Sequence, residues 1–427
     1  MSQISIRHRG PLQGEIKPPA DKSISHRAIM LASLAEGKSS IRNSLQAEDP
    51  VSTLKAFRQM GIDIDDKDSD RIIINGKGLR GLTAPRDNID CGNSGTTMRL
   101  LSGILSAQPF TSVLTGDKFL LRRPMRRIIK PLSEMGAHIS SEKGGRPPLT
   151  IKGGNLIAIT YHSPVASAQV KSAILFAGLY CEGCTTVIEP GKSRDHTERM
   201  LTSCGADINI DGLEVSIQGG KGLAPFDITI PGDLSSAAFF IAAGLIVPGS
   251  DIVIKKVGIN PTRTGIIDIF QKMGGDITLH NVHEVSGESV ADIRVRYSEL
   301  MGTDIGGDLI LRAIDEFPVL CAASAIAGGV TRISGASELR VKESDRIASM
   351  AMELRKTGVH VEESEDGLAI TGLDRLRHAV VQSHGDHRVA MSMAVAGLVT
   401  EGGLIIEDTE CINTSFPQFP ELLKSLY

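Results

Sequence analysis

Long apolar segments alternate along the chain with polar segments of helical length. The first apolar segment runs from Ala28 to Ala35, and a turn rich in Gly, Ser or charged residues precedes it. Similar turns precede later apolar segments, at residues 92–96, 166–169, 231–233, 306–308 and 384–388. Such internal repetition indicates an architecture built from copies of one structural unit.

A second marker lies out of phase with the first. A polar helical stretch ends in a glycine and is followed by a short strand-like stretch, for example Ile72–Ile74 or Leu149–Ile151. Glycine favours the left-handed conformation that ends many helices. We therefore expect helix C-caps at Gly61, Gly136, Gly205, Gly274 and Gly358.

The repeats predict an α/β fold of six units, three in each of two domains. A chain of 427 residues exceeds the usual size of one hydrophobic core. The strand-like N-terminal stretch from Ile4 to Lys17 has no repeat of its own, and the sixth unit lacks closing strands. We therefore expect domains at 20–230 and at 1–19 plus 231–427, with hinges near 17–21 and 228–233, facing each other across a cleft.

Composition excludes several classes of protein. Lys and Arg (46) nearly balance Asp and Glu (50), and the chain has no Trp and 4% aromatic residues, so we expect no nucleic-acid partner. The longest apolar run, Ala237 to Val247, is too short to span a membrane and predicts a buried helix. No targeting segment is recognisable, which favours the cytoplasm. Six scattered cysteines, including the pair Cys181 and Cys184, predict reduced thiols and no metal site.

Cations gather in the turns that precede the apolar segments. Lys22, Ser23 and Arg27 lie at the N-terminus of the first predicted helix, where backbone N–H groups and the dipole attract anions. Two unit charges about 5 Å apart repel by about 3 kcal/mol at an effective dielectric near 20. Many cations are therefore needed to bring two phosphorylated molecules together. The candidates are Lys22, Arg27, Arg99, Arg123, Lys171, Arg194, Lys342, Arg346 and Arg388.

Several motifs allow a second interpretation. The stretch 384–388 contains two histidines and an acid, yet its Arg388 at a helix start favours an anion over a metal. The stretch 342–346 is either a solvated charge cluster or an anion site. Asp315 lies in an apolar context, which leaves catalysis and a structural ion pair both open. Residues 76–81 match GxGxxG, but no helix follows, so we reject a dinucleotide site.

Motifs along nearly the whole chain resemble the EPSP synthase family (3-phosphoshikimate 1-carboxyvinyltransferase). They are Asp21–Arg27, Gly92–Thr96, Arg123–Met125, Ser167–Lys171, Arg340–Arg346 and Gly385–Arg388. The resemblance implies two inside-out α/β barrel domains of three repeats each. It also implies transfer of the enolpyruvyl group of phosphoenolpyruvate to the 5-hydroxyl of shikimate 3-phosphate, with no metal and no cofactor.

The same resemblance implies roles for individual residues. Shikimate 3-phosphate would be bound by Lys22, Ser23, Arg27, Ser167, Ala168, Gln169, Asp315 and Lys342. Phosphoenolpyruvate would be bound by Lys22, Gly95, Arg123, Gln169, Arg346 and Arg388. Asp315 would accept the hydroxyl proton, and either Glu343 or Lys22 would protonate the methylene carbon. Neighbouring cations favour the ionised form of Glu343, which a general acid cannot have.

The resemblance extends to a subtype and has two departures. Residues 116–118, 167–171, 194–198 and 260–263 are similar to the signatures of class II members. Gly95 stands where the most glyphosate-tolerant members carry Ala, so we expect glyphosate to inhibit. Thr414 stands where many members carry Lys, and Glu338 where some carry Asn.

Two alternative functions fit the sequence less well. A sister enzyme transfers enolpyruvyl to UDP-N-acetylglucosamine, but its loop carries Cys where this chain has Lys118. A non-catalytic clamp for phosphorylated metabolites would not need Asp315 or Glu343. We expect a monomer, because two domains can cover each other's cleft.

Overall fold

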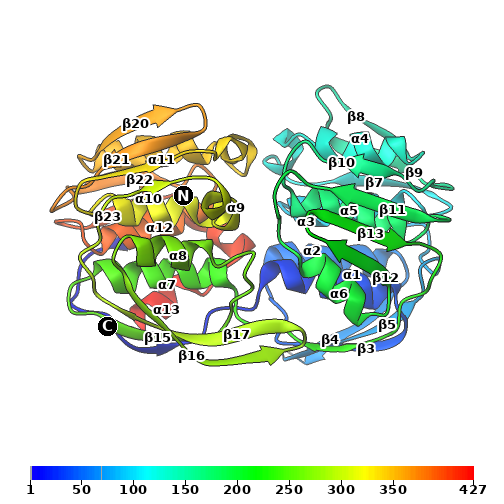
Figure 1. Ribbon diagram of the computed structural model, residues 1–427, viewed down its shortest axis with the longest axis horizontal. Coiled ribbons are helices and arrows are strands. Elements are labelled where there is room, and N and C mark those ends of the chain that lie inside the picture. The colour runs from blue at the N-terminus through cyan, green and yellow to red at the C-terminus, as the bar shows by residue number, and fades with distance from the viewer. Residues whose placement is uncertain (1, 69) are drawn as a thin grey trace. The chain divides into compact units, whose positions relative to one another are not determined.

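The computed structural model describes residues 2–68 and 70–427 (Figure 1). Contacts divide the chain into two compact units. The middle unit comprises Ala20–Ile230, and the terminal unit comprises Met1–Pro19 with Pro231–Tyr427. The two units are built from the same succession of elements.

In the described part of the middle unit, three four-stranded sheets share one pattern of pairing. The first two strands of each sheet run parallel, and the remaining neighbours run antiparallel. The sheets are β14(Asp227–Thr229)-β3(Glu36–Arg42)-β5(Arg71–Lys77)-β4(Asp63–Asp68), β6(Ile89–Asp90)-β7(Thr111–Thr115)-β9(Arg146–Lys152)-β8(His138–Glu142) and β10(Thr160–His162)-β11(Cys184–Ile188)-β13(Glu214–Gln218)-β12(Asp207–Asp211).

Each sheet of the middle unit is accompanied by one apolar and one more polar helix. The apolar helices α1 (Lys22–Leu34), α3 (Gly95–Leu105) and α5 (Ala168–Gly178) are buried along almost their whole length. The polar helices are α2 (Glu48–Gln59), α4 (Arg126–Glu134) and α6 (His196–Ser203), and a 3-10 turn, η1 (Leu120–Arg122), precedes α4. Strand β9 alternates exposed and buried residues. Helices therefore form the interior and sheets face solvent, which confirms the inside-out arrangement.

The terminal unit repeats this plan with help from the N-terminus. Its sheets, in the described residues, are β16(Asp276–Val285)-β17(Glu288–Arg296)-β15(Asp251–Gly258)-β2(Gln13–Ile16), β18(Asp304–Ile305)-β19(Val330–Ile333)-β21(Gly367–Thr371)-β20(His360–Ser364) and β1(Gln3–Ile6)-β23(Leu404–Glu407)-β22(Ala379–Gln382). Strand β1 pairs antiparallel with β23, as β21 does with β19. The two ends of the chain thus share one sheet.

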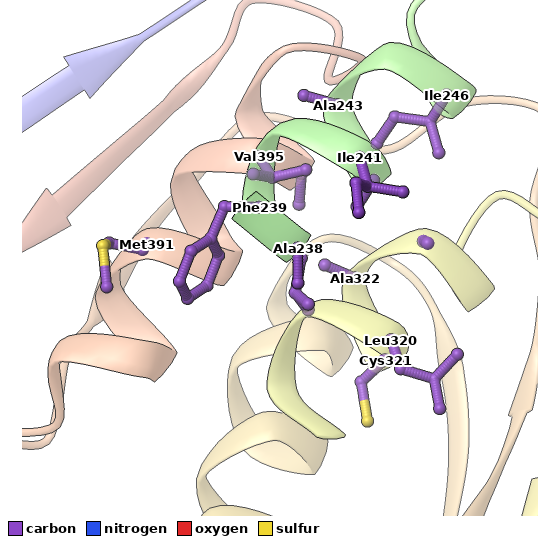
Figure 2. Close-up of a cluster of buried hydrophobic side chains, with 14 of the residues drawn as sticks. Ala238, Phe239, Ile241, Ala243, Ile246, Leu320, Cys321, Ala322, Met391 and Val395 are labelled. Atoms are coloured by element: carbon purple, nitrogen blue, oxygen red, sulfur yellow. The ribbon is translucent and has the colours of Figure 1, made fainter. Parts of the chain in front are cut away.

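Three apolar helices form the core of the terminal unit: α7 (Leu234–Ile246), α10 (Phe317–Ser324) and α12 (His387–Gly397). Figure 2 shows Phe239, Ala322 and Val395, one from each helix, within this cluster. The other helical elements are α8 (Gly265–Lys272), α9 (Asp308–Arg312), η2 (Ile314–Glu316), η3 (Ser337–Val341), α11 (Arg346–Lys356), η4 (Thr409–Thr414) and α13 (Phe419–Lys424). Helix α7 is buried throughout, as its sequence predicts.

The five predicted helix-ending glycines all have a positive φ. Their φ angles are 83°, 97°, 77°, 94° and 93° for Gly61, Gly136, Gly205, Gly274 and Gly358. Along the described residues, no helix has the length and apolar character needed to cross a membrane.

The apolar segment of the fifth repeat differs from the single helix that its sequence suggests. It is divided into α9, η2 and α10. Pro318 lies in the first turn of α10, a position that suits proline but does not suit a helix continuing from the preceding residues. Asp315 therefore lies on the 3-10 turn η2, not inside a helix.

Candidate active site

The helices that carry the candidate residues begin with capping side chains. Asp21 and Ser94 accept hydrogen bonds from the N–H groups of Ile24 (2.9 Å) and Thr97 (3.1 Å). In the terminal unit, Asp345 and Asp386 cap α11 and α12 in the same way. Such caps fix where each helix starts, and they place Lys22, Gly95, Arg346 and Arg388 in the first turns.

In the middle unit, Arg27 is held by groups from three helices. Its Nε donates to Thr197 Oγ1 (2.6 Å), its Nη2 to Ser172 Oγ (2.9 Å) and its Nη1 to the Ser23 carbonyl (3.0 Å). Arg27 lies in the second turn of α1, one turn later than the sequence suggested, and it is buried. The geometry fixes the guanidinium beside the start of α1, where Lys22 forms an ion pair with Asp49 (3.0 Å).

Gln169 and Arg99 join the starts of α3 and α5. Gln169 Oε1 accepts a hydrogen bond from Arg99 Nη1 (2.7 Å), and Gln169 Nε2 donates to Thr96 Oγ1 (3.0 Å). Arg123 is buried nearby and donates to Asn93 Oδ1. These contacts surround Gly95 with two guanidinium groups, a suitable environment for an anion.

Ser167 and Ala168 lie at the start of α5, next to a buried ionic cluster. The Ser167 N–H donates to Glu189 Oε1 (2.9 Å). Lys171 Nζ lies 2.7 Å from both Glu189 Oε2 and Glu198 Oε1, and its side chain is 3% exposed. Burial lowers the pKa of Lys171, but the two carboxylates outweigh it and hold the pKa above its usual value. Lys171, expected among the anion-binding cations, forms ion pairs with Glu189 and Glu198 in the structure.

A buried histidine connects the first three helices of the middle unit. His26 Nδ1 lies 2.7 Å from Thr53 Oγ1, and Thr53 Oγ1 lies 2.8 Å from Thr97 Oγ1. Burial, followed by the charges of Lys22 and Arg27, lowers the pKa of His26 well below its usual value. A neutral imidazole thus supports the cationic start of α1.

In the terminal unit, one buried guanidinium is bound by three carboxylates. Arg346 is 1% exposed. Its Nε lies 2.8 Å from Asp386 Oδ2, its Nη2 2.8 Å from Glu343 Oε2 and its Nη1 3.3 Å from Asp315 Oδ1. Burial raises the pKa of Asp386, but the charges of Arg346 and His387 and the hydrogen bond from Arg346 together outweigh burial and lower the net pKa. Burial lowers the pKa of Arg346, and Asp386, Glu343 and Asp315 together raise it further than burial lowers it.

Arg388 and Lys342 complete this group. Arg388 Nη1 donates to the carbonyl of Asp315 (2.9 Å), and its Nη2 lies 3.9 Å from Asp315 Oδ2. Asp315 therefore has a structural ion pair and a place beside the candidate anion ligands. Lys342 lies 2.8 Å from Glu338, and Thr414 lies 3.3 Å from His387 Nδ1.

Two of the possible metal ligands in residues 384–388 contact other side chains. His384 Nε2 lies 2.8 Å from Glu353 Oε1, and Asp386 is bonded to Arg346. Within the described residues, no group of three or more His, Cys, Asp and Glu side chains is arranged to hold a metal ion.

The predicted residues thus form two groups, one within each unit. The middle unit holds Lys22, Ser23, Arg27, Gly95, Arg123, Ser167, Ala168 and Gln169. The terminal unit holds Asp315, Lys342, Glu343, Arg346 and Arg388. Sequence reasoning missed the carboxylates Asp49 and Asp386 that orient the cations. Asp386 is followed three residues later by an apolar residue, Val389, a pattern common where Asp caps a helix, so the sequence could have indicated its capping role. Nothing in the local sequence indicates that Asp49 pairs with Lys22.

Comparison with known proteins identifies relatives over the whole chain. The family model described as EPSP synthase (3-phosphoshikimate 1-carboxyvinyltransferase) matches residues 6–423. The 3-phosphoshikimate 1-carboxyvinyltransferase of Geotalea uraniireducens is 56% identical over 427 residues, covering 100% of this chain and 99% of that protein. The protein of that name from Geobacter sulfurreducens is 55% identical over 424 residues, with 99% of each chain covered.

Solved structures agree with these sequence relatives. EPSP synthase from Acinetobacter baumannii is similar with a TM-score of 0.87 at 47% identity, covering 99% of this chain and 98% of that one. The enolpyruvyl transferase NikO from Streptomyces tendae has a TM-score of 0.78 at 17% identity, covering 99% and 96%. At 17% identity, the similarity to NikO shows a shared fold and nothing more.

Proposed function

The chain belongs to the EPSP synthase family, and we propose that the two groups of residues described above divide that family's reaction between them. The enzyme transfers the enolpyruvyl group of phosphoenolpyruvate to the 5-hydroxyl of shikimate 3-phosphate and releases phosphate. This step belongs to the shikimate pathway, which leads to chorismate and the aromatic amino acids.

The proposed ligands of shikimate 3-phosphate are mostly in the middle unit. A phosphate suits the start of α1, where Lys22, Ser23 and the oriented Arg27 lie near the positive end of the helix dipole. The start of α5 supplies further polar groups for the ring hydroxyls. The full set is Lys22, Ser23, Arg27, Ser167, Ala168, Gln169, Asp315 and Lys342.

Three of the proposed ligands of phosphoenolpyruvate are guanidinium groups. Phosphoenolpyruvate carries a carboxylate and a phosphate, and planar guanidinium groups bind both kinds of anion through paired N–H donors. Carboxylates orient Arg346, and Asn93 orients Arg123. The full set is Lys22, Gly95, Arg123, Gln169, Arg346 and Arg388.

The chemistry consists of an addition and an elimination, and both need proton transfer. The 5-hydroxyl oxygen forms a bond to C2 of phosphoenolpyruvate, its proton passes to Asp315, and C3 gains a proton from Glu343 or Lys22. The resulting methyl group then returns a proton to that same group while the C–O bond to phosphate breaks and phosphate leaves, which restores the double bond. A positioned acid and base typically contribute about 10²- to 10⁴-fold to such a step.

One observation carries this assignment: Asp315 and Glu343 are both bound to the guanidinium group of Arg346. A proposed base and a proposed acid are thereby held by one proposed ligand of phosphoenolpyruvate. An anion that binds Arg346 competes with Glu343 for its N–H groups. Such competition would weaken the ion pair and favour the protonated carboxyl that a general acid needs.

The test compares Glu343→Gln with Lys22→Met, using Glu362→Gln, at an exposed glutamate of the same unit, as the control. We expect Glu343→Gln to lower kcat by at least about 100-fold while the Kd of shikimate 3-phosphate, measured by calorimetry, stays unchanged. Full activity of Glu343→Gln, with a large loss of kcat in Lys22→Met, would assign the acid to Lys22. Full activity of both variants would remove both residues from proton transfer.

We further propose a cytoplasmic monomer that glyphosate inhibits in competition with phosphoenolpyruvate. All six cysteines are free, which suits a reducing compartment. Light scattering at a mass near the chain's 45.5 kDa would support the monomer, and twice that mass would contradict it.

A further inference from the structure

Glu353 is a buried carboxylate with no part in the proposed chemistry. Its side chain, on α11, is 0% exposed and lies 2.8 Å from His384 Nε2, 2.6 Å from Lys356 Nζ and 2.9 Å from the Gln382 backbone nitrogen. Burial raises the pKa of Glu353, but hydrogen bonds from His384, Lys356 and Gln382 outweigh it and lower the pKa. An ionised carboxylate only accepts hydrogen bonds, so Nε2 of His384 carries a proton.

Helix α11 holds the segment Gln382–Asp386, here called the α12 loop, at two points. Arg346 and Glu353 are seven residues apart, close to two helical turns, and so lie on one face of α11. Glu353 bonds to Gln382 and His384, while Arg346 Nε bonds to Asp386 Oδ2 at 2.8 Å. The two contacts fix both ends of the α12 loop.

The loop between these points has an uncommon backbone conformation. His384 has a φ of 56° and Gly385 a φ of 71°. A residue with a side chain adopts this region uncommonly, so contacts around His384 are needed to stabilise it. The bond to Glu353 supplies that constraint, together with the Gly385 N–H that donates to Ser383 Oγ (3.0 Å).

The α12 loop ends at the proposed phosphoenolpyruvate ligands. Asp386, its last residue, accepts a hydrogen bond from the backbone N–H of Arg388 at 2.9 Å and so sets the start of α12. The position of Asp386 also sets the direction of the Arg346 guanidinium. A shift of the loop would therefore move both arginines.

We propose that Glu353 and His384 are positioning residues, which hold the α12 loop so that Arg346 and Arg388 bind phosphoenolpyruvate. The inference rests on the proposed role of these two arginines. Removing the Glu353–His384 bond lets His384 leave the left-handed conformation and displaces Asp386. Loss of this bond therefore weakens the binding of phosphoenolpyruvate and leaves the contacts within the middle unit unchanged.

The test measures KM for phosphoenolpyruvate, kcat, and the Kd of shikimate 3-phosphate alone in Glu353→Gln, His384→Ala and His384→Gln. We expect Glu353→Gln and His384→Ala to raise KM roughly tenfold. We expect a smaller fall in kcat, because Arg346 also contacts Asp315 and Glu343, and a Kd of shikimate 3-phosphate within about twofold of the parent value. His384→Gln offers an amide N–H in place of Nε2 and restores most of the affinity. Lys356→Gln, which leaves both loop contacts of Glu353 intact, is the matched control with unchanged KM.

Arg388→Ala separates failure of this inference from failure of the proposed function. A raised KM in Arg388→Ala, with unchanged KM in Glu353→Gln and His384→Ala, would overturn the positioning role alone. Unchanged KM in Arg388→Ala would overturn the proposed role of Arg388 itself. A fall in kcat at constant KM would indicate a general structural role and also overturn the inference. The His384 side chain is 28% exposed, so its variants test the idea even where Glu353→Gln does not fold.

Discussion

A Cβ atom built on Gly95 would lie 2.6 Å from Nη1 of Arg99. The same atom would lie 3.1 Å from Nη1 of Arg123, and Arg99 also donates to Gln169. Both distances are shorter than a comfortable contact, so a methyl group at position 95 must displace the guanidinium groups around it. The absence of a side chain at Gly95 is thus part of the proposed phosphoenolpyruvate site.

Glyphosate is predicted to inhibit the enzyme in competition with phosphoenolpyruvate. Gly95→Ala should raise the inhibition constant of glyphosate at least roughly tenfold, because a methyl group intruding on a tight site costs about 1 to 3 kcal/mol. KM for phosphoenolpyruvate should rise less. Gly222→Ala, where an added Cβ meets open space, is the control and should change neither value.

Steady-state inhibition at several phosphoenolpyruvate concentrations gives both constants. An enzyme that glyphosate does not inhibit competitively at any practical concentration contradicts the prediction. Equal glyphosate inhibition of Gly95→Ala and the parent enzyme contradicts the steric argument.

Lys171→Met is predicted to destabilise the middle unit strongly. The substitution leaves Glu189 and Glu198 buried without their shared cation. Removing one partner from a buried ionic cluster typically costs about 3 to 5 kcal/mol. Urea unfolding should show this loss, whereas Lys130→Met, at an exposed pair, should change the free energy of unfolding by less than about 0.5 kcal/mol. Similar small changes in both variants would refute the structural role of Lys171.

His26 is predicted to make the middle unit less stable in mild acid. Its folded-state pKa lies well below that of the unfolded chain, about 6.5, so below about pH 6.5 the unfolded state binds a proton that the folded state excludes. The stabilisation is complete above about pH 6.5 and is lost, at up to about 1.4 kcal/mol per pH unit, as the pH falls toward the folded-state pKa.

Urea unfolding between about pH 5 and about pH 7.5 measures this dependence. His26→Gln keeps a polar group near Thr53 but has no proton to bind, so its stability should vary less over that range. The same pH dependence in His26→Gln and the parent would assign the effect to other groups.

Local rules in the sequence predicted much of the fold. Positive φ at Gly61 and its counterparts follows from the geometry of helix ends, and the starts of α1, α3 and α12 lie at the turns that precede the apolar segments. The break before α10 was less visible, because Pro318 is compatible with the first turn of a new helix as well as with a loop.

The cations of the site were also recognisable, but their partners were not. Arg346 stands out as a cation at a helix start, where the dipole disfavours it. Its partner Asp386 is 40 residues away, and Lys22 and Asp49 are 27 apart. Such pairs depend on how helices pack. The repeated turns placed Lys171 among the candidate cations, but they could not reveal its ion pairs with Glu189 and Glu198.

The most direct test of the central claim is release of phosphate from phosphoenolpyruvate by the purified protein, with and without shikimate 3-phosphate, in the presence of a chelator. The account predicts release that requires shikimate 3-phosphate, persists with the chelator and falls by at least about 100-fold in Asp315→Asn. Absence of release, although both substrates bind, would contradict the account and indicate a binding protein instead.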